Sequence, residues 1–292
     1  MLELTLNQVT KKYKDLCAVD HVEAVFTHGV YGLLGANGAG KTTLLRLMCD
    51  ILRPDEGEIL LDRNPINRLG ASYRRFLGYL PQDFGFYPDF TAERFLLYMA
   101  ALKALPSLEA KRKTAELLAM VGLEDSKNKK IKTFSGGMVR RLGIAQAMLN
   151  DPEILILDEP TAGLDPKERI RFRNIISSFS KDRIVILSTH IVSDVEYIAD
   201  EILLMKKGRF LQQGSVENIT KQVQGRVWEL VTDHAGAQDV YKRQTVEFHG
   251  NEGSSIHRIS SDQPRSAQNV EKMYVSGVFG GIPLYHEVAD EN

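Results

Sequence analysis

Short apolar runs separated by polar turns recur along the chain up to residue 214. Leucines alternate with polar residues over 2–6, which predicts a strand with one buried face. Continuous apolar runs at 30–34, 154–157 and 184–187 are typical of strands buried on both faces of a parallel sheet. A helix is predicted over 166–179, between the last two runs. This alternation of strand and helix predicts an α/β fold.

A helical segment interrupts the pattern. Thr91 can cap a helix whose apolar residues recur at helical spacing. Pro106 ends that helix, a second one is predicted over 108–121, and a third runs to residue 149. These helices predict an α-helical subdomain at about 84–149, inserted into the α/β core.

The signal weakens after residue 214. Residues 202–211 predict a strand hairpin, and beyond it only 226–231 and 246–248 have strand character. Gly, Ser and Asn punctuate the remainder. We therefore predict a large α/β domain over 1–214 and a small C-terminal region over 215–292, mostly β-structured or partly disordered.

Composition narrows the range of partners. The 292 residues carry a formal net charge of −1, which gives no reason to expect nucleic acid or an anionic membrane surface. The N-terminal residues lack the blocks of a signal peptide, and no apolar run reaches membrane-spanning length. Cys17 and Cys49 have no metal-binding or redox spacing, which favours a reducing compartment. We expect a cytoplasmic protein that needs a partner chain for any membrane role.

The most specific motif follows the strand predicted at 30–34 and precedes a predicted helix. It fits the phosphate-binding pattern G-x-x-x-x-G-K-[ST] and consists of Gly35, Ala36, Asn37, Gly38, Ala39, Gly40, Lys41, Thr42 and Thr43. Glycines let backbone amides turn inward around phosphate oxygens, and the helix N-terminus adds its partial positive charge. A glycine-rich turn could match by chance, but the flanking strand and helix favour a nucleoside triphosphate site.

Side chains with suitable chemistry extend this site. Lys41 would contact the β- and γ-phosphates, and the Thr42 hydroxyl would ligate Mg²⁺. Asp158 and Glu159 follow the strand at 154–157, at the carboxyl end where α/β sheets place ligand chemistry. We expect Asp158 to hold Mg²⁺ and Glu159 to polarise an attacking water. Alone, Asp-Glu-Pro could be an ordinary turn; together with the phosphate-binding loop, it indicates catalysis.

Two more polar residues come after predicted strands. His190 follows the strand at 184–187, and it reaches the edge that carries Glu159 if the two strands are neighbours. A lone histidine is more often structural, so only this topology favours a contact with the γ-phosphate. Gln82 follows a strand predicted at 77–80 and could coordinate Mg²⁺ or the attacking water.

Ser135, Gly136 and Gly137 open the third predicted helix. A serine and two glycines at a helix N-terminus can form a second anion site. The alternative is an ordinary helix cap with a flexible entry.

The order of these motifs resembles that of the ATP-binding subunits of ABC-type transporters, over roughly residues 2–214. The resemblance implies that 35–43 is the Walker A motif, 134–138 the signature motif and 154–159 the Walker B motif. It also implies that Tyr13 stacks on adenine, that Gln82 lies in the Q-loop, that Asp165 lies in the D-loop and that His190 is the switch histidine.

Several expectations follow from the resemblance. The fold would be a P-loop NTPase core, with a mixed β-sheet and flanking helices, and the ligands would be ATP and Mg²⁺. Two copies would pair head to tail, so that Ser135 and Gly137 of one copy close on ATP held by Lys41 of the other. This arrangement would explain the second anion site. The other partner would be a separate transmembrane permease subunit, with the chain on the cytoplasmic face of the membrane and with export favoured over import.

Three positions depart from the family pattern. Ala36 stands where the family usually has Pro, Phe134 where it has Leu, and Met138 where it has Gln. Neighbouring residues supply the loop amides, so we expect Ala36 to matter little. Ser135 and Gly137 are kept, so we expect hydrolysis to survive, at a rate that Met138 could lower.

Other interpretations remain open. Phe84, Phe86 and Tyr87 could dock a membrane partner, or they could pack beneath their own loop. A soluble ABC-type ATPase acting in translation, DNA repair or cofactor assembly is the alternative function; such proteins usually carry tandem ATPase domains, a coiled coil or a basic arm. A nucleotide sensor without transport would lack Glu159 or His190, and both are present.

Overall fold

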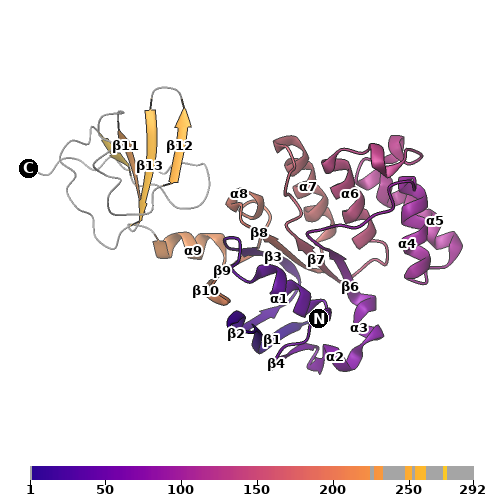
Figure 1. Cartoon of the computed structure of the whole chain (residues 1–292), viewed down its shortest axis with the longest axis horizontal. Coiled ribbons are helices and arrows are strands. Elements are labelled where there is room, and N and C mark those ends of the chain that lie inside the picture. The colour runs from indigo at the N-terminus through magenta and orange to yellow at the C-terminus, as the bar shows by residue number, and fades with distance from the viewer. Residues whose placement is uncertain (1, 224–226, 233–246, 252–253, 261–271, 275–292) are drawn as a thin grey trace, which may run out of the picture. The chain divides into compact units, whose positions relative to one another are not determined.

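Two β-sheets form the framework of the first of two units, Met1–Ser215 (Figure 1). The strands of the larger sheet are β3 (Gly29–Leu34), β6 (Leu77–Leu80), β7 (Ile154–Asp158), β8 (Ile184–Thr189), β9 (Glu201–Lys206) and β10 (Arg209–Gly214). Their order is β10-β9-β3-β8-β7-β6, and all neighbours are parallel except β10 and β9. The structure, a computed structural model, describes residues 2–223, 227–232, 247–251, 254–260 and 272–274.

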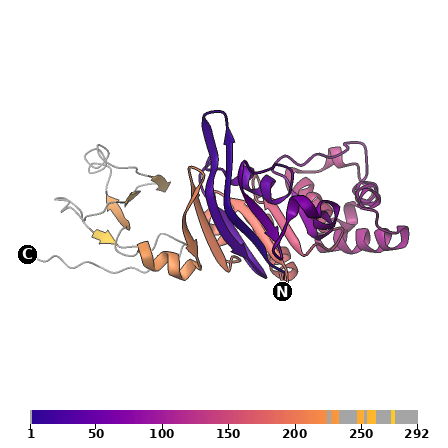
Figure 2. The same ribbon diagram turned by 90° about the horizontal axis from the view of Figure 1, so that it is seen from below.

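The smaller sheet is antiparallel. Its strands are β1 (Leu4–Tyr13), β2 (Leu16–Phe26), β4 (Glu56–Leu61) and β5 (Asn64–Pro65), in the order β2-β1-β4-β5. Figure 2 shows the long hairpin of β1 and β2. Tyr13 is the last residue of β1. The prediction missed β2, although its buried Val22, Ala24 and Phe26 alternate with exposed residues.

Some helices lie around the two sheets, and others lie beyond the edge strand β6 of the larger sheet. Around the sheets lie α1 (Lys41–Met48), α2 (Ile66–Leu69), α3 (Ala71–Phe76), α7 (Pro166–Phe179) and α8 (Val192–Val195). Beyond β6 lie α4 (Ala92–Leu102), α5 (Ser107–Met120), η1 (Glu124–Ser126), η2 (Ile131–Thr133) and α6 (Gly136–Ala147) (Figure 1). Within the described ranges, no helix combines the length and the apolar character needed to cross a bilayer. The arrangement confirms the predicted α/β fold with helical elements between β6 and β7, whereas α2 and α3 were not predicted.

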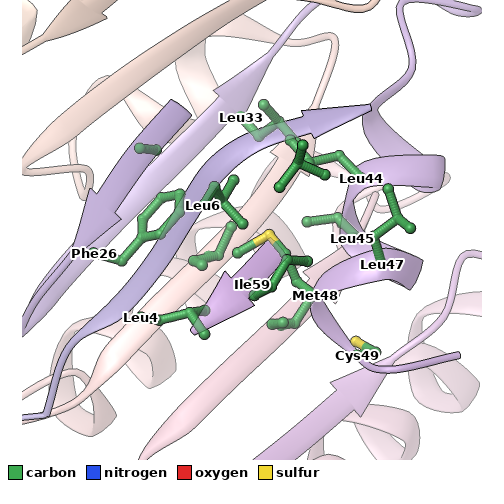
Figure 3. Packing of buried hydrophobic residues seen from close by; sticks show 14 of the residues in the cluster. Leu4, Leu6, Phe26, Leu33, Leu44, Leu45, Leu47, Met48, Cys49 and Ile59 are labelled. Atoms are coloured by element: carbon green, nitrogen blue, oxygen red, sulfur yellow. The ribbon is translucent and has the colours of Figure 1, made fainter. Parts of the chain in front are cut away.

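A hydrophobic cluster joins the two sheets through α1. Leu44, Leu45 and Met48 of α1 are at most 1% exposed, and they pack with Leu33 of the larger sheet and Leu6 of the smaller one (Figure 3). Burial of this apolar surface stabilises the fold by roughly 25 cal/mol for each Å² removed from water. The packing also fixes α1, and therefore the phosphate-binding loop in front of it.

The second unit, Val216–Asn292, contains a small antiparallel sheet. Its described elements are α9 (Val216–Val223), β11 (Val227–Thr232), β12 (Glu247–Asn251), β13 (Ser254–Ser260) and β14 (Lys272–Tyr274). The strand order is β12-β13-β11-β14. β11 and β12 overlap the two segments where the sequence indicated strands, 226–231 and 246–248, of which Arg226 and Val246 lie outside the described residues. Helix α9 and strands β13 and β14 were not predicted.

Lys103, at the C-terminal end of α4, allows a test of how burial of a charged side chain affects the free energy of unfolding. Its Nζ donates to Asn150 Oδ1, and burial lowers the pKa of Lys103 from 10.5 to about 8. As pH rises from about 8 to about 10.5, the folded chain has already lost this proton while the unfolded chain keeps it, so the free energy of unfolding increases. We expect Lys103→Met to remove about 1–3 kcal/mol of that increase.

The measurement is urea unfolding at about pH 7.5 and about pH 10. The quantity compared between variants is the slope of the free energy of unfolding against pH. Lys111→Met, which removes an exposed lysine of α5, is the control and should keep the wild-type slope. A Lys103→Met slope equal to that of wild type would contradict the prediction.

Candidate functional site

The phosphate-binding loop, residues 35–43, joins β3 to α1. Gly40 precedes α1 with a φ of 107°, in the region that favours glycine. A Cβ atom at this position would lie 2.1 Å from the Ala18 carbonyl oxygen, so any other residue would require the backbone to shift. No side chain of the described residues caps α1, which leaves the amides of its first turn available for an anion.

Lys41 is buried within this loop, with 6% of its side chain exposed. Its Nζ donates to the carbonyl oxygens of Gly35 at 2.7 Å and Ala36 at 3.3 Å. The same nitrogen lies 3.4 Å from Glu159 Oε1, and the Glu159 side chain is 7% exposed. A buried ion pair therefore places the lysine cation beside the loop amides.

Strand register brings the other predicted residues to the same edge of the larger sheet. Because β3, β6, β7 and β8 are parallel, their carboxyl ends share one edge. Asp158 of β7 is in register with Ser188 of β8. Gln82, Glu159 and His190 each follow one of these strands, so the predicted neighbourhood of β7 and β8 is observed.

Asp158 and Thr42 fit a magnesium ion. Thr42 Oγ1 lies 3.3 Å from Asp158 Oδ1, and Ser188 Oγ donates to that same oxygen at 2.6 Å. The other carboxylate oxygen, Oδ2, is buried and has no hydrogen-bond partner among the described residues. Mg²⁺ is usually held by one or two carboxylates together with waters and substrate phosphates. The described residues contain no cluster of three or more His, Cys, Asp or Glu suited to a metal, so a cation here would need further ligands, such as phosphate, water or the Gln82 side chain on the pocket wall.

Glu159 links the lysine to the histidine. Its φ is 47°, a left-handed conformation that residues other than glycine seldom adopt. The backbone N–H donates to Ser188 Oγ at 2.9 Å, and Oε2 lies 3.0 Å from His190 Nδ1. The His190 side chain is 45% exposed, so the ring can face a ligand while it orients the carboxylate.

A pocket of about 650 Å³ lies against the phosphate-binding loop. Residues 37–43, Gln82 and Glu159 line it, together with Tyr13 and Lys207, whereas Asp158 and His190 do not. The volume lies in the usual range for small-ligand sites. Tyr13 is 43% exposed, and an aromatic ring exposed on a pocket wall can stack on a purine base.

Segment 135–137 does not line this pocket within a single chain. Ser135 caps α6 and Asp165 caps α7, through side-chain oxygens that accept backbone hydrogen bonds at 3.2 Å and 2.8 Å. Ser135 and Gly136 are exposed, and Gly137 is half-buried. Ser135, Gly136, Gly137 and Asp165 are thus absent from the lining of the phosphate-binding pocket of their own chain.

The aromatic residues after Gln82 pack on neighbours and also remain partly exposed. The ring of Phe84 contacts that of Phe95 edge to face at a centroid distance of 5.7 Å. Tyr87 stacks on Phe90 at 4.9 Å and is 48% exposed. Local packing therefore accounts for Phe84, while Tyr87 contributes to an exposed surface.

Three buried polar residues near the carboxyl edge of the larger sheet were not predicted. Ser188 binds both Asp158 and the backbone of Glu159, and it could have been found because it extends the predicted strand at 184–187 by one residue. Asp194 is 1% exposed and forms an ion pair with Arg169 at 3.3 Å. Arg140 donates to backbone carbonyls beside the site. Burial lowers the pKa of Arg140, while the nearby Asp158 carboxylate opposes that shift.

Known proteins match the chain in both sequence and structure. The protein-family model described as ABC transporter matches residues 23–162. The uncharacterized ABC transporter ATP-binding protein YxlF of Bacillus subtilis (strain 168) is 37% identical over 229 residues, covering 78% of this chain and 76% of YxlF. Nod factor export ATP-binding protein I of Burkholderia thailandensis is 36% identical over 214 residues, covering 73% of this chain and 70% of that protein. The dimeric post-hydrolysis structure of the ATP-binding cassette MJ0796, bound to ADP and Pi, matches with a TM-score of 0.67 and 26% identity, over 73% of this chain and 98% of that one.

Proposed function

The chain belongs to the family of ABC transporter ATP-binding proteins, and from this premise we propose that two copies hydrolyse MgATP at a shared interface to drive export through a separate membrane subunit. Members of this family hydrolyse ATP. The observation that carries the proposal is a pair of contacts beside the phosphate-binding loop: Glu159 Oε1 lies 3.4 Å from Lys41 Nζ, and Glu159 Oε2 lies 3.0 Å from His190 Nδ1. Phosphoryl transfer is promoted by a cation at the phosphates and by a residue that positions the attacking water. Lys41 and Glu159 can serve as these two groups, and His190 can orient the carboxylate.

Binding of ATP would use the loop and the pocket wall. The amides of 35–43 and the Lys41 ammonium would compensate the phosphate charge, and Tyr13 would stack on the adenine. Thr42, Asp158 and Gln82 would hold Mg²⁺, which neutralises charge on the phosphate oxygens when bound. The buried Asp158 Oδ2, which has no hydrogen-bond partner in the described part of the chain, supports this assignment.

Hydrolysis would depend on Glu159. Its carboxylate would orient the attacking water and accept a proton from it, while Lys41 would shift from the carboxylate toward the phosphates. His190 would keep the Glu159 carboxylate in place through Nδ1 and contact the γ-phosphate with the rest of its ring. The 3.0 Å separation of His190 Nδ1 and Glu159 Oε2 supports this role.

A second copy would complete each site. Ser135, Gly136 and Gly137, together with Asp165, lie outside the pocket of their own chain, as expected if they serve the ATP of a partner copy. The match to a dimeric cassette, MJ0796, supports the same arrangement.

Two observations support a membrane partner and export: the name of one relative and one exposed surface of this chain. A relative is named as an export protein for Nod factor. The exposed Tyr87, five residues after Gln82, offers a surface on which a permease could dock, and such docking would hold the chain at the cytoplasmic face of the membrane.

The test is phosphate release by the purified full chain, alone and together with a membrane subunit that co-purifies with it. We expect release that requires Mg²⁺ and stops when EDTA is added. Transport would then be measured in membrane vesicles of both orientations, with ATP on one side. Absence of phosphate release in both preparations would reject hydrolysis, and transport only toward the ATP-containing side would reject export.

A further inference from the structure

Arg140 is a buried arginine of α6 whose donors all point at backbone carbonyls. Only 8% of the residue is exposed. Its guanidinium contacts the carbonyl oxygens of Pro81, Gln82, Asp158, Glu159 and Pro160. The distances are 2.8 Å from Nη1 to Gln82, 2.7 Å from Nη2 to Asp158 and 3.2 Å from Nε to Pro160. A planar guanidinium has five N–H donors in a fixed fork, so this one side chain can bridge two loops at once.

The acceptors belong to the two loops that carry Gln82 and Glu159. In one loop they are the carbonyls of 158–160, on both sides of the left-handed residue Glu159. A non-glycine residue in this conformation is strained and persists only where its surroundings hold it. The hydrogen bonds from Arg140 are part of that restraint.

Close packing keeps α6 against the other loop. A Cβ atom on Gly143, one turn after Arg140, would lie 2.7 Å from Leu80 Cδ1 and 3.2 Å from the Phe84 ring. Leu80 ends β6 and Phe84 follows Gln82. The helix therefore has little freedom to slide relative to the Gln82 loop without disturbing the contacts of Arg140.

We propose that Arg140 is a positioning residue for ATP hydrolysis, which joins the signature helix α6 to the loops of Gln82 and Glu159 and holds both loops in register. This inference rests on the proposed function. Arg140 also ties two sites together, because Ser135 at the start of α6 would serve the ATP of a partner copy, whereas Glu159 serves the ATP of its own chain. A shift of α6 is thereby transmitted to the backbone that aims the Glu159 carboxylate.

The neighbouring Arg141 offers a matched control. It is also 8% exposed and donates to the carbonyl oxygens of Val121 at 2.7 Å and Gly122 at 3.0 Å. It forms an ion pair with Glu168 at 2.8 Å. Its burial and bonding resemble those of Arg140, but its backbone acceptors lie at the end of α5, away from the catalytic edge.

The first experiment compares Arg140→Gln, Arg140→Lys and Arg141→Gln in the full chain, with kcat, KM for ATP and Tm measured for each. We expect kcat to fall about 10–100-fold in Arg140→Gln, with KM changed by no more than about threefold, because misplaced groups lose rate rather than binding. Arg140→Lys keeps the charge but has a single ammonium, which cannot bridge both loops, so its kcat should stay below half of the wild-type value. Arg141→Gln should lower Tm by a similar amount with kcat within about threefold of wild type.

The second experiment needs no nucleotide. Amide hydrogen exchange of the full chain should rise in peptides covering 80–84 and 158–162 in Arg140→Gln and Arg140→Lys, and at 119–123 in Arg141→Gln. If Arg140→Gln does not fold, Arg140→Lys supplies both readouts. Equal kcat losses in the Arg140 and Arg141 variants, or unchanged exchange at both catalytic loops, would overturn the inference. Failure of the proposed function would look different, because the wild-type chain itself would release no phosphate.

Discussion

Glu159→Gln is expected to lower the rate of ATP hydrolysis by about 10²–10⁴-fold, the usual contribution of a positioned general base. Glutamine has nearly the same shape as glutamate, so the contacts around β7 should persist. It cannot accept the proton of the attacking water, however. It also removes the negative charge that lies 3.4 Å from Lys41 Nζ, which frees the lysine for the phosphates. We therefore expect ATP binding to be kept or strengthened.

The variant should also trap an ATP-bound dimer, because the closed pair cannot proceed to products. Size-exclusion chromatography with light scattering, in the presence of MgATP, would show the dimer, and phosphate release would give the rate. Glu153→Gln is a suitable control, since Glu153 is exposed at the amino end of the same strand. Unchanged turnover in Glu159→Gln would reject Glu159 as the base.

Lys41→Met is expected to reduce ATP affinity by about 10²-fold or more. The ammonium is the cation that the phosphate-binding loop contributes, and one hydrogen-bonded charge pair can account for 2–5 kcal/mol of binding. The substitution also leaves the buried Glu159 carboxylate without its cation. Loss of one partner of a buried pair destabilises a fold by about 3–5 kcal/mol, so Tm should fall in the absence of nucleotide.

A double variant separates the two effects of Lys41→Met. Lys41→Met combined with Glu159→Gln removes both charges, so Tm should recover while ATP affinity stays low. Arg46→Met, at an exposed position of the same helix, should change neither quantity. Calorimetric titration with ATP and thermal unfolding are the measurements. A double variant no more stable than Lys41→Met would show that the ion pair does not determine the stability of the site.

Local patterns were sufficient for the α/β fold. The continuous apolar runs became β7 and β8, and the helix predicted over 166–179 has those same bounds as α7. β2 was missed because its residues alternate between buried and exposed only over 22–26, whereas its first half, 16–21, has no regular alternation. The helix α9 lies in a segment where the sequence predicted mainly strands.

The sequence by itself determined the family and the class of fold, and it predicted which residues would act on ATP. The family, the fold class and the candidate residues can be inferred from short motifs, because the chemistry of each residue and of its neighbours along the chain is sufficient to recognise such a motif. Only the tertiary structure decided that Lys41 pairs with Glu159, that Ser188 orders Asp158 and that Arg140 spans two loops. Each of these contacts joins residues far apart in sequence, and parallel strand register and helix packing, not local pattern, bring them together. From the sequence alone, an arginine in a helix is expected to be exposed to solvent. Only the structure shows the backbone carbonyls to which Arg140 donates.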